Sequence, residues 1–511
     1  MKKFKSSLLC IILVLLLSSQ KGTPTVNAQI NSNNRDNYNK IDTLIDRNQY
    51  EKAKEICLEM LKKNPSDPVI KTYLGMIYTA QFKYNEAEKV LKEALAKTPN
   101  NYIARNALGI IYYQKASSFE RDSDKYYESA IVEFETVTRL SPTFYQAYTN
   151  AAKVFQDTGK LDQAELYYRK ALSIEPNDSD AIEGLGTVYF QKNLIDVAIQ
   201  KFLKAISINK RNSTAHFHLG EAYMAKGEYD KAITYLQSSL YIFPNSSIVH
   251  EMLGKAYEYK GDINSAITEY QKAILIKPKS VQPYLNLANI YENNGEYDLA
   301  ILELKNAVAK NPEHKEILIK IAELSINNDN VDQGIKYYKT FLDNKDTSIE
   351  ALKGLSQAYY IKTTEISTTE AISKNDLLSL QSELSKNLQI NPDDPEINLA
   401  LLRLAVITNS KNEAEMYFNK IISMKNIRPL YPLIKGEAYF IMGRFRDSMN
   451  EFKLAVNMGD SAEDLLNIGK ALLLNKCYSV AKIAFERILV ISPNNQNAKK
   501  ILIKITDLEN Q

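Results

Sequence analysis

The chain has 511 residues, of which 45% are hydrophobic and 24% charged, with a formal net charge of +3. These ordinary fractions exclude a disordered or fibrous chain. The chain contains 17 Gly and 15 Pro, too few for a β-sandwich or barrel, which needs turn residues about every 8–12 positions. Because a single core stops growing near about 250–300 residues, the length requires several domains or a repeat array.

The first 28 residues have the three parts of a secretory signal peptide. Lysines stand at positions 2, 3 and 5, residues 8–17 form an unbroken apolar run, and Ala28 closes a small-residue cleavage pattern. The apolar run is too short to span a bilayer, which takes about 20 residues. We therefore expect residues 1–28 to be a signal peptide cleaved after Ala28. The alternative is an uncut N-terminal membrane anchor.

Loss of this segment makes the mature chain nearly neutral. Four lysines and no acidic residue leave with it, so Lys and Arg fall from 64 to 60 against 61 Asp and Glu. A near-neutral chain lacks the basic surface typical of nucleic-acid binding. The remaining cysteines, Cys57 and Cys477, are too far apart in sequence to indicate a disulfide framework, and we expect Cys57 to be a small core residue. No second apolar stretch of the sequence approaches spanning length.

Three residue types recur every 34 positions through most of the remaining chain. A small residue stands at Ala152, Gly186, Gly220, Gly254, Ala288 and Ala322. An alanine recurs at Ala164, Ala198, Ala232, Ala266 and Ala300. A proline recurs at Pro142, Pro176, Pro244, Pro278 and Pro312, with Lys210 at the one place between them that lacks it. Within one unit the apolar positions 4, 7, 8 and 11 share one face of a first helix, and positions 20, 24 and 27 share one face of a second. The proline at position 32 ends the second helix, because it lacks an N–H and clashes with the preceding turn.

This pattern resembles the tetratricopeptide repeat family, whose consensus W-x2-L-G-x2-Y…A-x3-F…P spans about 34 residues. The chain departs from it at the tryptophan position, where Tyr148, Ile182, His216, His250, Tyr284 and Leu318 stand. The resemblance implies an all-α, right-handed superhelical solenoid of about thirteen helix-turn-helix units, in which each unit stacks on its neighbours. It also implies that the first helices line a concave surface that binds proteins or peptides.

The repeat divides the chain into segments of different regularity. We predict a flexible leader at 29–33, N-terminal units at 34–144, a regular array at 145–348, degenerate C-terminal units at 349–495 and a capping helix at 496–511. We expect two insertions, at 114–129 and 361–379, between the two helices of their units. Polar loops grafted on a rigid scaffold are often functional; the alternative is a tolerated, longer hairpin.

Catalytic and metal-binding motifs are missing from the sequence. It has no H-E-x-x-H, C-x-x-C or G-x-S-x-G motif and no phosphate-binding glycine loop. Of its 4 histidines, His216 and His250 occupy equivalent core positions one repeat apart. We therefore expect no enzyme activity, no cofactor and no metal site, and we interpret these histidines as core or groove residues.

Positions 2, 5, 9 and 12 of each first helix form a stripe that faces away from the second helix. In units two and three the stripe is uncharged and includes Val69, Met76, Ile103, Ile110 and Tyr113. In units five to eight it mixes acidic and apolar residues, including Glu183, Phe190, Phe217, Glu221, Glu251, Glu258 and Glu292. We predict that these residues bind a segment with apolar anchors at one end and Lys or Arg at the other. The alternative is a solvated acidic lining. The position-5 lysine typical of co-chaperone members is missing.

The sequence thus predicts an exported, non-enzymatic scaffold that binds a protein or peptide partner and no nucleic acid. Two alternatives stay open: a structural component of an envelope secretion or polysaccharide-export assembly, and an accessory subunit of an enzyme complex. The Met-Lys-Lys start and the Lys-, Asn- and Ile-rich composition favour a bacterial host, and so a periplasmic or cell-surface location. In a eukaryotic secretory host, Asn177, Asn212 and Asn245 would lie in N-x-[ST] sequons.

Overall fold

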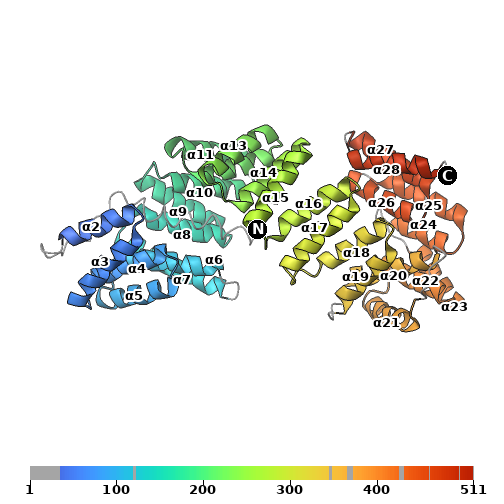
Figure 1. Ribbon diagram of the computed structural model, residues 1–511, viewed down its shortest axis with the longest axis horizontal. Coiled ribbons are helices and arrows are strands. Elements are labelled where there is room, and N and C mark those ends of the chain that lie inside the picture. The colour runs from blue at the N-terminus through green and yellow to red at the C-terminus, as the bar shows by residue number, and fades with distance from the viewer. Residues whose placement is uncertain are drawn as a thin grey trace. The chain divides into compact units, whose positions relative to one another are not determined.

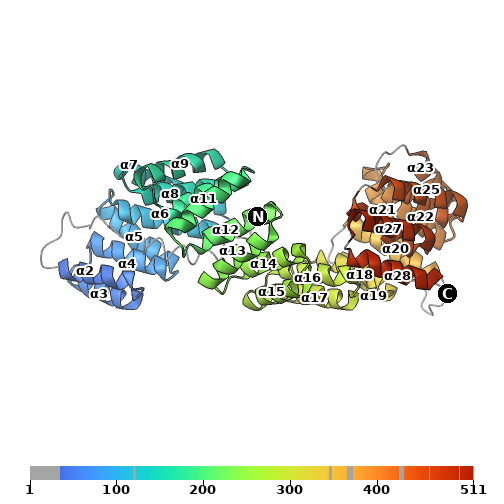
Figure 2. The same ribbon diagram turned by 90° about the horizontal axis from the view of Figure 1, so that it is seen from above.

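The computed structural model describes residues 35–118, 122–343, 348–364, 372–424, 431–459, 461–493 and 495–509. The predicted signal peptide and leader lie outside these residues. All regular elements of the described residues are helices, numbered α2 to α28 and labelled in Figures 1 and 2. The chain divides into two compact units, unit 1 from Met1 to Ile276 and unit 2 from Lys277 to Gln511, and each is described by itself.

The described part of unit 1 consists of seven helical hairpins stacked in chain order (Figure 2). Their helices are α2 (Arg35–Asp46), α3 (Tyr50–Lys63), α4 (Pro68–Ala80), α5 (Tyr84–Lys97), α6 (Tyr102–Ser118), α7 (Ser123–Leu140), α8 (Tyr145–Asp157), α9 (Leu161–Ile174), α10 (Ser179–Gln191), α11 (Ile195–Ile208), α12 (Ser213–Ala225), α13 (Tyr229–Ile242), α14 (Ser247–Lys260) and α15 (Ile263–Ile276).

The described part of unit 2 consists of six hairpins and a final helix. Their helices are α16 (Val281–Asn293), α17 (Tyr297–Lys310), α18 (Ile317–Asn327), α19 (Val331–Leu342), α20 (Ile349–Thr364), α21 (Lys374–Ile390), α22 (Pro395–Ile407), α23 (Lys411–Ser423), α24 (Tyr431–Ile441), α25 (Phe445–Met458), α26 (Ala462–Leu474), α27 (Tyr478–Ile491) and α28 (Gln496–Glu509). These paired helices confirm the predicted all-α solenoid.

Local sequence signals set the ends of the helices. Asp67 caps α4 by accepting hydrogen bonds from the N–H groups of Val69 and Ile70, with Pro68 at the first helical position. The fifteenth residue of a repeat unit lies in the turn between its two helices and adopts the left-handed backbone conformation. Glycine suits this conformation at Gly159, where φ is 77°. Lys476 holds the same place in the last hairpin, with φ 55°.

Close packing between the two helices of a hairpin explains the recurring small residues. Gly186 on α10 lies under the ring of Phe202 on α11, and a Cβ at Gly186 would lie 2.7 Å from the ring atom Cε1. Ala198 on α11 and Ala232 on α13 are both fully buried, with 0% of their surface exposed. The small side chains therefore let the helices approach, as the spacing predicted.

Enlarging either alanine is expected to destabilise the array locally. Ala198→Leu or Ala232→Leu should each cost about 1–3 kcal/mol, because the added atoms overpack a filled interface. Since units couple chiefly to their neighbours, amide hydrogen exchange should rise in α10–α13 and stay unchanged in α2–α5. Ala225→Leu, at an exposed position of α12, is the matched control. Equal acceleration across all of unit 1 would contradict this expectation.

Polar residues at the tryptophan position connect three of the units to the preceding one. The ring nitrogen Nε2 of His216 lies 3.2 Å from the carbonyl oxygen of Lys210, and that of His250 lies 3.2 Å from the carbonyl oxygen of Pro244. The Tyr284 hydroxyl donates to the carbonyl of Pro278 at 3.2 Å. Each contact joins position 4 to position 32 of the unit before it, so these histidines serve packing between units.

Both predicted insertions are more helical than expected. Residues 114–118 extend α6 and residues 123–129 extend α7, so these helices have 17 and 18 residues. Tyr112 packs on Tyr126 and Tyr113 on Tyr127, with ring centroids 6.3 and 6.2 Å apart. These aromatic pairs favour the alternative of a longer hairpin, although residues 119–121 of this insertion lie outside the described residues. In the second insertion, 361–364 extend α20 and 374–379 begin α21, while 365–371 lie outside the described residues.

Candidate binding surfaces

Three of the predicted apolar residues of the unit 1 stripe are buried. Met76, Ile110 and Phe217 are only 7%, 5% and 1% exposed, and each belongs to a hydrophobic core cluster. They stand at positions 5 and 9, where first helices of successive hairpins contact one another. The expectation that these three side chains are open to a partner is therefore wrong.

The other predicted apolar residues of the stripe keep part of their surface. Val69, Ile103, Tyr113 and Phe190 are half-buried. Tyr113 does not point freely into solvent, because its hydroxyl donates a hydrogen bond to the Asp157 carboxylate at 2.8 Å. Burial next to that carboxylate raises the pKa of the Tyr113 hydroxyl, which keeps it neutral and donating.

A histidine joins two of the predicted acidic residues. His218 on α12 places Nδ1 2.8 Å from Glu221 and Nε2 3.3 Å from Glu183 on α10. Burial lowers the pKa of the imidazole, but the two carboxylates outweigh it, so the pKa lies above its ordinary value. Phe202 stacks on the same ring with centroids 5.8 Å apart. The sequence analysis assigned no role to His218; its place one turn from Glu221 was the available signal.

The remaining predicted acids of unit 1 lie on α14. Glu251 pairs with Lys255 at 2.9 Å, and Glu258 accepts a hydrogen bond from the Tyr270 hydroxyl at 2.7 Å. Both carboxylates are half-buried, so they combine fixed positions with access to solvent. With Glu183 and Glu221, these residues make four acidic groups against two basic ones, Lys255 and His218. The predicted stripe of α10–α14 is therefore an acidic surface.

Glu292, the last predicted groove acid, lies in unit 2 and is buried at 6% exposure. Its carboxylate contacts Lys320 at 2.9 Å and Lys470 at 3.0 Å. Burial raises the pKa of the carboxyl, but the two ammonium groups outweigh it, so the pKa lies below its ordinary value. Nearby, the Lys500 ammonium donates to the carbonyl of Asn294 at 2.9 Å. These contacts tie the first hairpin of unit 2 to its last helices, so Glu292 is not open to a partner.

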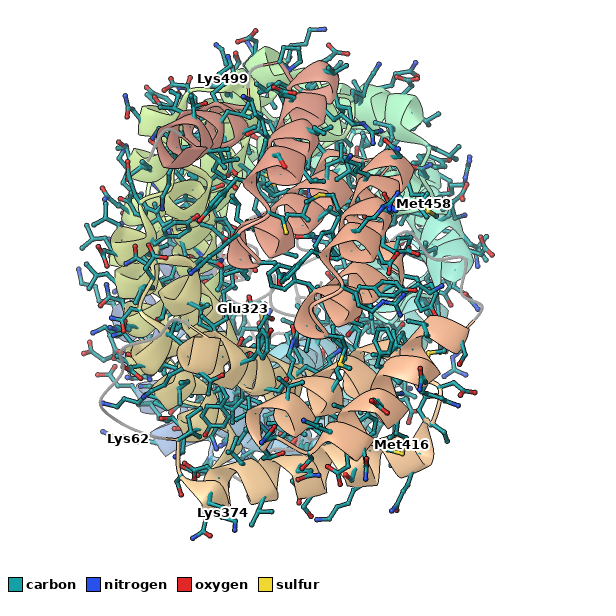
Figure 3. All side chains as sticks on the ribbon, turned by 90° about the vertical axis from the view of Figure 1, so that its right-hand side faces the viewer. Lys62, Glu323, Lys374, Met416, Met458 and Lys499 are labelled. Carbon is teal, nitrogen blue, oxygen red and sulfur yellow. The ribbon has the colours of Figure 1, made fainter. Side chains whose placement is uncertain are left out.

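A second carboxylate of unit 2 lies close to this network. Figure 3 places Glu323, on α18, on the inner side of the unit 2 helices, with Lys374, Met416 and Lys499 on the outer side. Burial raises the pKa of the Glu323 carboxyl, with Lys320 opposing and Glu350 adding to the effect. The inner side of unit 2 therefore carries charged groups held by intramolecular pairing.

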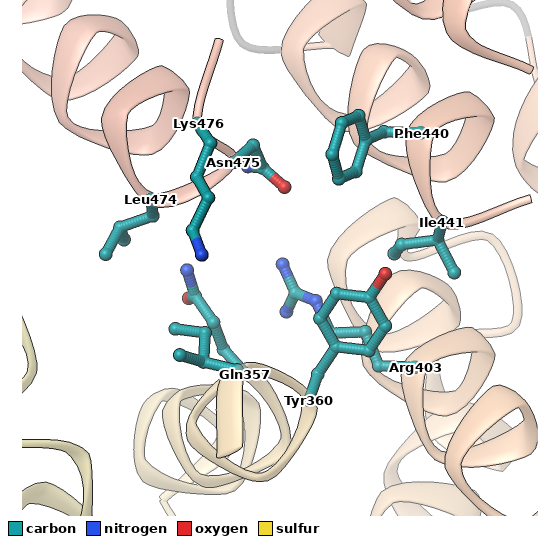
Figure 4. Close-up of a pocket in the computed structure, with 9 residues that line it drawn as sticks. Gln357, Tyr360, Arg403, Phe440, Ile441, Leu474, Asn475 and Lys476 are labelled. Carbon is teal, nitrogen blue, oxygen red and sulfur yellow. The ribbon is translucent and has the colours of Figure 1, made fainter. Parts of the chain in front are cut away.

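A pocket of about 160 Å³ lies between the first helices of four successive hairpins of unit 2 (Figure 4). Its lining residues come from α20, α22, α24, the end of α26 and the turn after it, and are Gln357, Tyr360, Ile361, Arg403, Phe440, Ile441, Leu474, Asn475 and Lys476. Arg403 is buried and pairs with the buried carboxylate of Glu437 at 2.5 Å. The sequence analysis missed this pocket, although Arg403 is the one charged residue between positions 397 and 410.

No group of three metal-binding side chains occurs among the residues that the structure describes. Cys57 and Cys477 are free and buried. Burial raises the pKa of the Cys57 thiol to about 12 and that of the Cys477 thiol to about 11, so both remain protonated near neutral pH. The expectation that Cys57 is a core residue is confirmed by its 0% exposure. Of the helices that the structure describes, none has the length and apolar character to cross a membrane.

Family models match most of the region that contains the repeat. Residues 44–245 match the tetratricopeptide repeat protein 21 N-terminal ARM repeat. Residues 254–295 match the TPR repeat, and residues 281–324 match a tetratricopeptide repeat model. Anaphase-promoting complex subunit 3 of Schizosaccharomyces pombe is 30% identical over 70 residues, which are 14% of this chain. The matched stretch covers 10% of the length of that relative.

Solved structures are also similar to parts of the chain. A crystal structure of MamA is 25% identical, covers 32% of this chain and 96% of its own, and has a TM-score of 0.28. A tetratricopeptide repeat protein from Parabacteroides merdae is 19% identical, covers 53% of this chain and 98% of its own, and has a TM-score of 0.38.

Proposed function

We propose that this chain, which belongs to the tetratricopeptide repeat family, binds a basic protein segment on the stripe of α10–α14. The family supports the general role of a non-enzymatic protein-interaction scaffold. The observation that carries the finer proposal is the set of half-buried carboxylates Glu183, Glu221, Glu251 and Glu258, which outnumber the two basic side chains paired with them, His218 and Lys255. Partly buried charges are screened less by salt than fully exposed ones.

The partner segment would carry lysine or arginine beside apolar residues. Phe190 and Met224 are half-buried neighbours of the acidic groups and pack against the same core cluster. Apolar side chains of a partner that contact them would lose water and supply most of the affinity. The carboxylates would mainly fix orientation and speed association. Since Met76, Ile110 and Phe217 are buried, the proposed surface excludes them.

A short alternating Lys/Leu peptide, capped at both ends, tests this surface. Glu251→Gln combined with Glu258→Gln is expected to weaken its binding about threefold to tenfold at low salt, from two partly exposed charge pairs. The difference should shrink as salt screens the charges. Isothermal titration calorimetry on the full chain measures both quantities.

The matched control is Glu55→Gln combined with Glu86→Gln, which removes the same charge from exposed positions of α3 and α5. This control should leave the peptide affinity close to that of the unmodified chain. Equal losses from the two double variants would mean that net charge, and not the surface of α10–α14, controls binding.

We also propose that the protein is exported, on the evidence of the N-terminal sequence pattern. Mass spectrometry of the protein from its native host is expected to find a mature N-terminus at Gln29. A majority of molecules that begin at Met1 would contradict export by cleavage and would favour the anchored alternative. The proposal of a periplasmic or cell-surface location depends on the same measurement.

A further inference from the structure

The pocket of unit 2 brings together donor groups that have no other use in the fold. Lys476 lies in the turn between α26 and α27, and Figure 4 shows its ammonium directed toward the Gln357 amide on α20 and the guanidinium of Arg403 on α22. Among the described residues, neither the Lys476 ammonium nor the Gln357 amide has a hydrogen-bond partner.

The turn between α26 and α27 presents Lys476 to the pocket. The left-handed region disfavours residues with a Cβ, and other hairpins place glycine, asparagine, aspartate or, at Phe82, phenylalanine in this conformation. Lys476 adopts it with φ 55° and is exposed. Its position next to Asn475, also in the lining, gives the turn two polar side chains at the rim of the pocket.

The charge of the pocket fits a single negative group. Arg403 and Lys476 are the cations of the lining, but the carboxylate of Glu437 compensates Arg403. One positive charge therefore remains, together with the amide donors of Gln357. A monoanion would neutralise this charge, whereas a dianion would leave a desolvated negative charge in a partly buried site.

We propose that this pocket binds one carboxylate group of a partner segment, with an apolar side chain of that segment against Phe440, Ile441 and Leu474. The lysine and amide donors hold the carboxylate, since hydrogen bonds with a charged partner are the stronger ones. The apolar wall takes the neighbouring residue of the segment. This inference rests on the proposed scaffold function and adds a second binding site, in unit 2. The stripe of α10–α14 would bind basic groups of a partner, whereas this pocket would bind an acidic group.

The carboxylate could belong to a chain terminus or to an acidic side chain. Three peptides, each with phenylalanine before the last residue, distinguish these two sources. The first ends in glutamine with a free C-terminal carboxylate, and the second ends in glutamate with an amidated C-terminus. The third ends in glutamine with an amidated C-terminus and has neither carboxylate. Phenyl phosphate serves as the dianionic probe. Ligand-observed NMR titrations of the full chain give a dissociation constant for each probe.

One or both carboxylate peptides are expected to bind at least tenfold more tightly than the amidated glutamine peptide. Lys476→Gln should weaken that binding about tenfold, which corresponds to the loss of one charge-assisted hydrogen bond. Gln357→Leu should weaken it less. Lys453→Gln, at an exposed position of α25 outside the pocket, is the matched control and should change nothing. Neither lysine is buried, so the variants are expected to fold.

Equal affinity for the three peptides, no binding of any of them, or an unchanged affinity in Lys476→Gln would overturn the proposal. Tighter binding of phenyl phosphate than of the carboxylate peptides would overturn the assignment to a monoanion. These outcomes leave the Lys/Leu peptide experiment on unit 1 unaffected, because its variants lie on α14. Failure of the pocket is therefore distinguishable from failure of the proposed scaffold surface.

Discussion

Arg403→Leu is expected to destabilise the second half of unit 2 by about 3–5 kcal/mol, because it leaves the Glu437 carboxylate buried without its ion-pair partner. Arg403 and Glu437 are 7% and 6% exposed, so water cannot replace the lost contact. Amide hydrogen exchange followed by mass spectrometry should show faster exchange in α22–α25. Because repeat arrays unfold in parts, this local readout is preferable to a single melting temperature.

The double variant Arg403→Leu with Glu437→Leu separates charge from packing. Replacing both partners of a buried pair with apolar residues is often neutral or stabilising, so exchange in α22–α25 should return close to that of the unmodified chain. If the double variant is as unstable as Arg403→Leu alone, the loss comes from packing of the arginine side chain and not from the unpaired carboxylate.

Ile110→Glu is expected to unfold the hairpin of α6 and α7 in the isolated protein. Ile110 is 5% exposed inside a core cluster. A glutamate placed there must stay protonated, and raising its pKa from about 4.3 to above 7 costs on the order of 4 kcal/mol. Lost apolar contacts add to this cost. Circular dichroism and hydrogen exchange of the purified variant measure the effect without any partner.

The neighbouring variant Ile103→Glu provides the comparison for Ile110→Glu. Ile103 belongs to the same predicted stripe but is half-buried, so its carboxylate can reach solvent and the fold should persist. A folded, exchange-protected Ile110→Glu protein would show that the stripe of α6 is open, as the sequence analysis first expected.

The hairpin fold could be predicted because it depends on contacts within one period of the repeat. Glycine at position 8 under a ring at position 24, as with Gly186 and Phe202, is visible as a spacing of 16 residues. The alanine at position 20 and the helix-ending proline also act within one repeat unit, so the sequence of that unit predicts their effect. The burial of Ala198 and Ala232 and the pairing of consecutive helices follow from these local rules.

Whether a stripe residue is exposed or buried could not be predicted from the periodicity of a single helix. Helical periodicity separates the face toward the second helix from the opposite face, but positions 5 and 9 contact the first helix of the next hairpin. Met76 and Phe217 are buried for this reason. The partners of Glu292 could not be predicted either, since Lys470 lies 178 residues further along the chain and meets it only through the curvature of unit 2.

The spacing of the Arg403–Glu437 pair is visible in the sequence, but its burial is not. The two residues are 34 positions apart, so they occupy position 9 of successive units. Glu221 and Lys255 show the same spacing of opposite charges at position 9, yet both are half-buried and pair with His218 and Glu251 instead. The pocket beside this pair depends in addition on the direction of the Lys476 side chain, which the sequence does not specify.

Site-specific photocrosslinking in the native host tests most directly whether α10–α14 is a protein-binding surface. A photoreactive phenylalanine at Met224, on α12, is expected to crosslink a discrete protein, and an excess of the Lys/Leu peptide in a cell extract should suppress the product. The same probe at Leu203, an exposed position of α11, should give no such product. A product of equal yield from Leu203, or no product from Met224, would contradict the account.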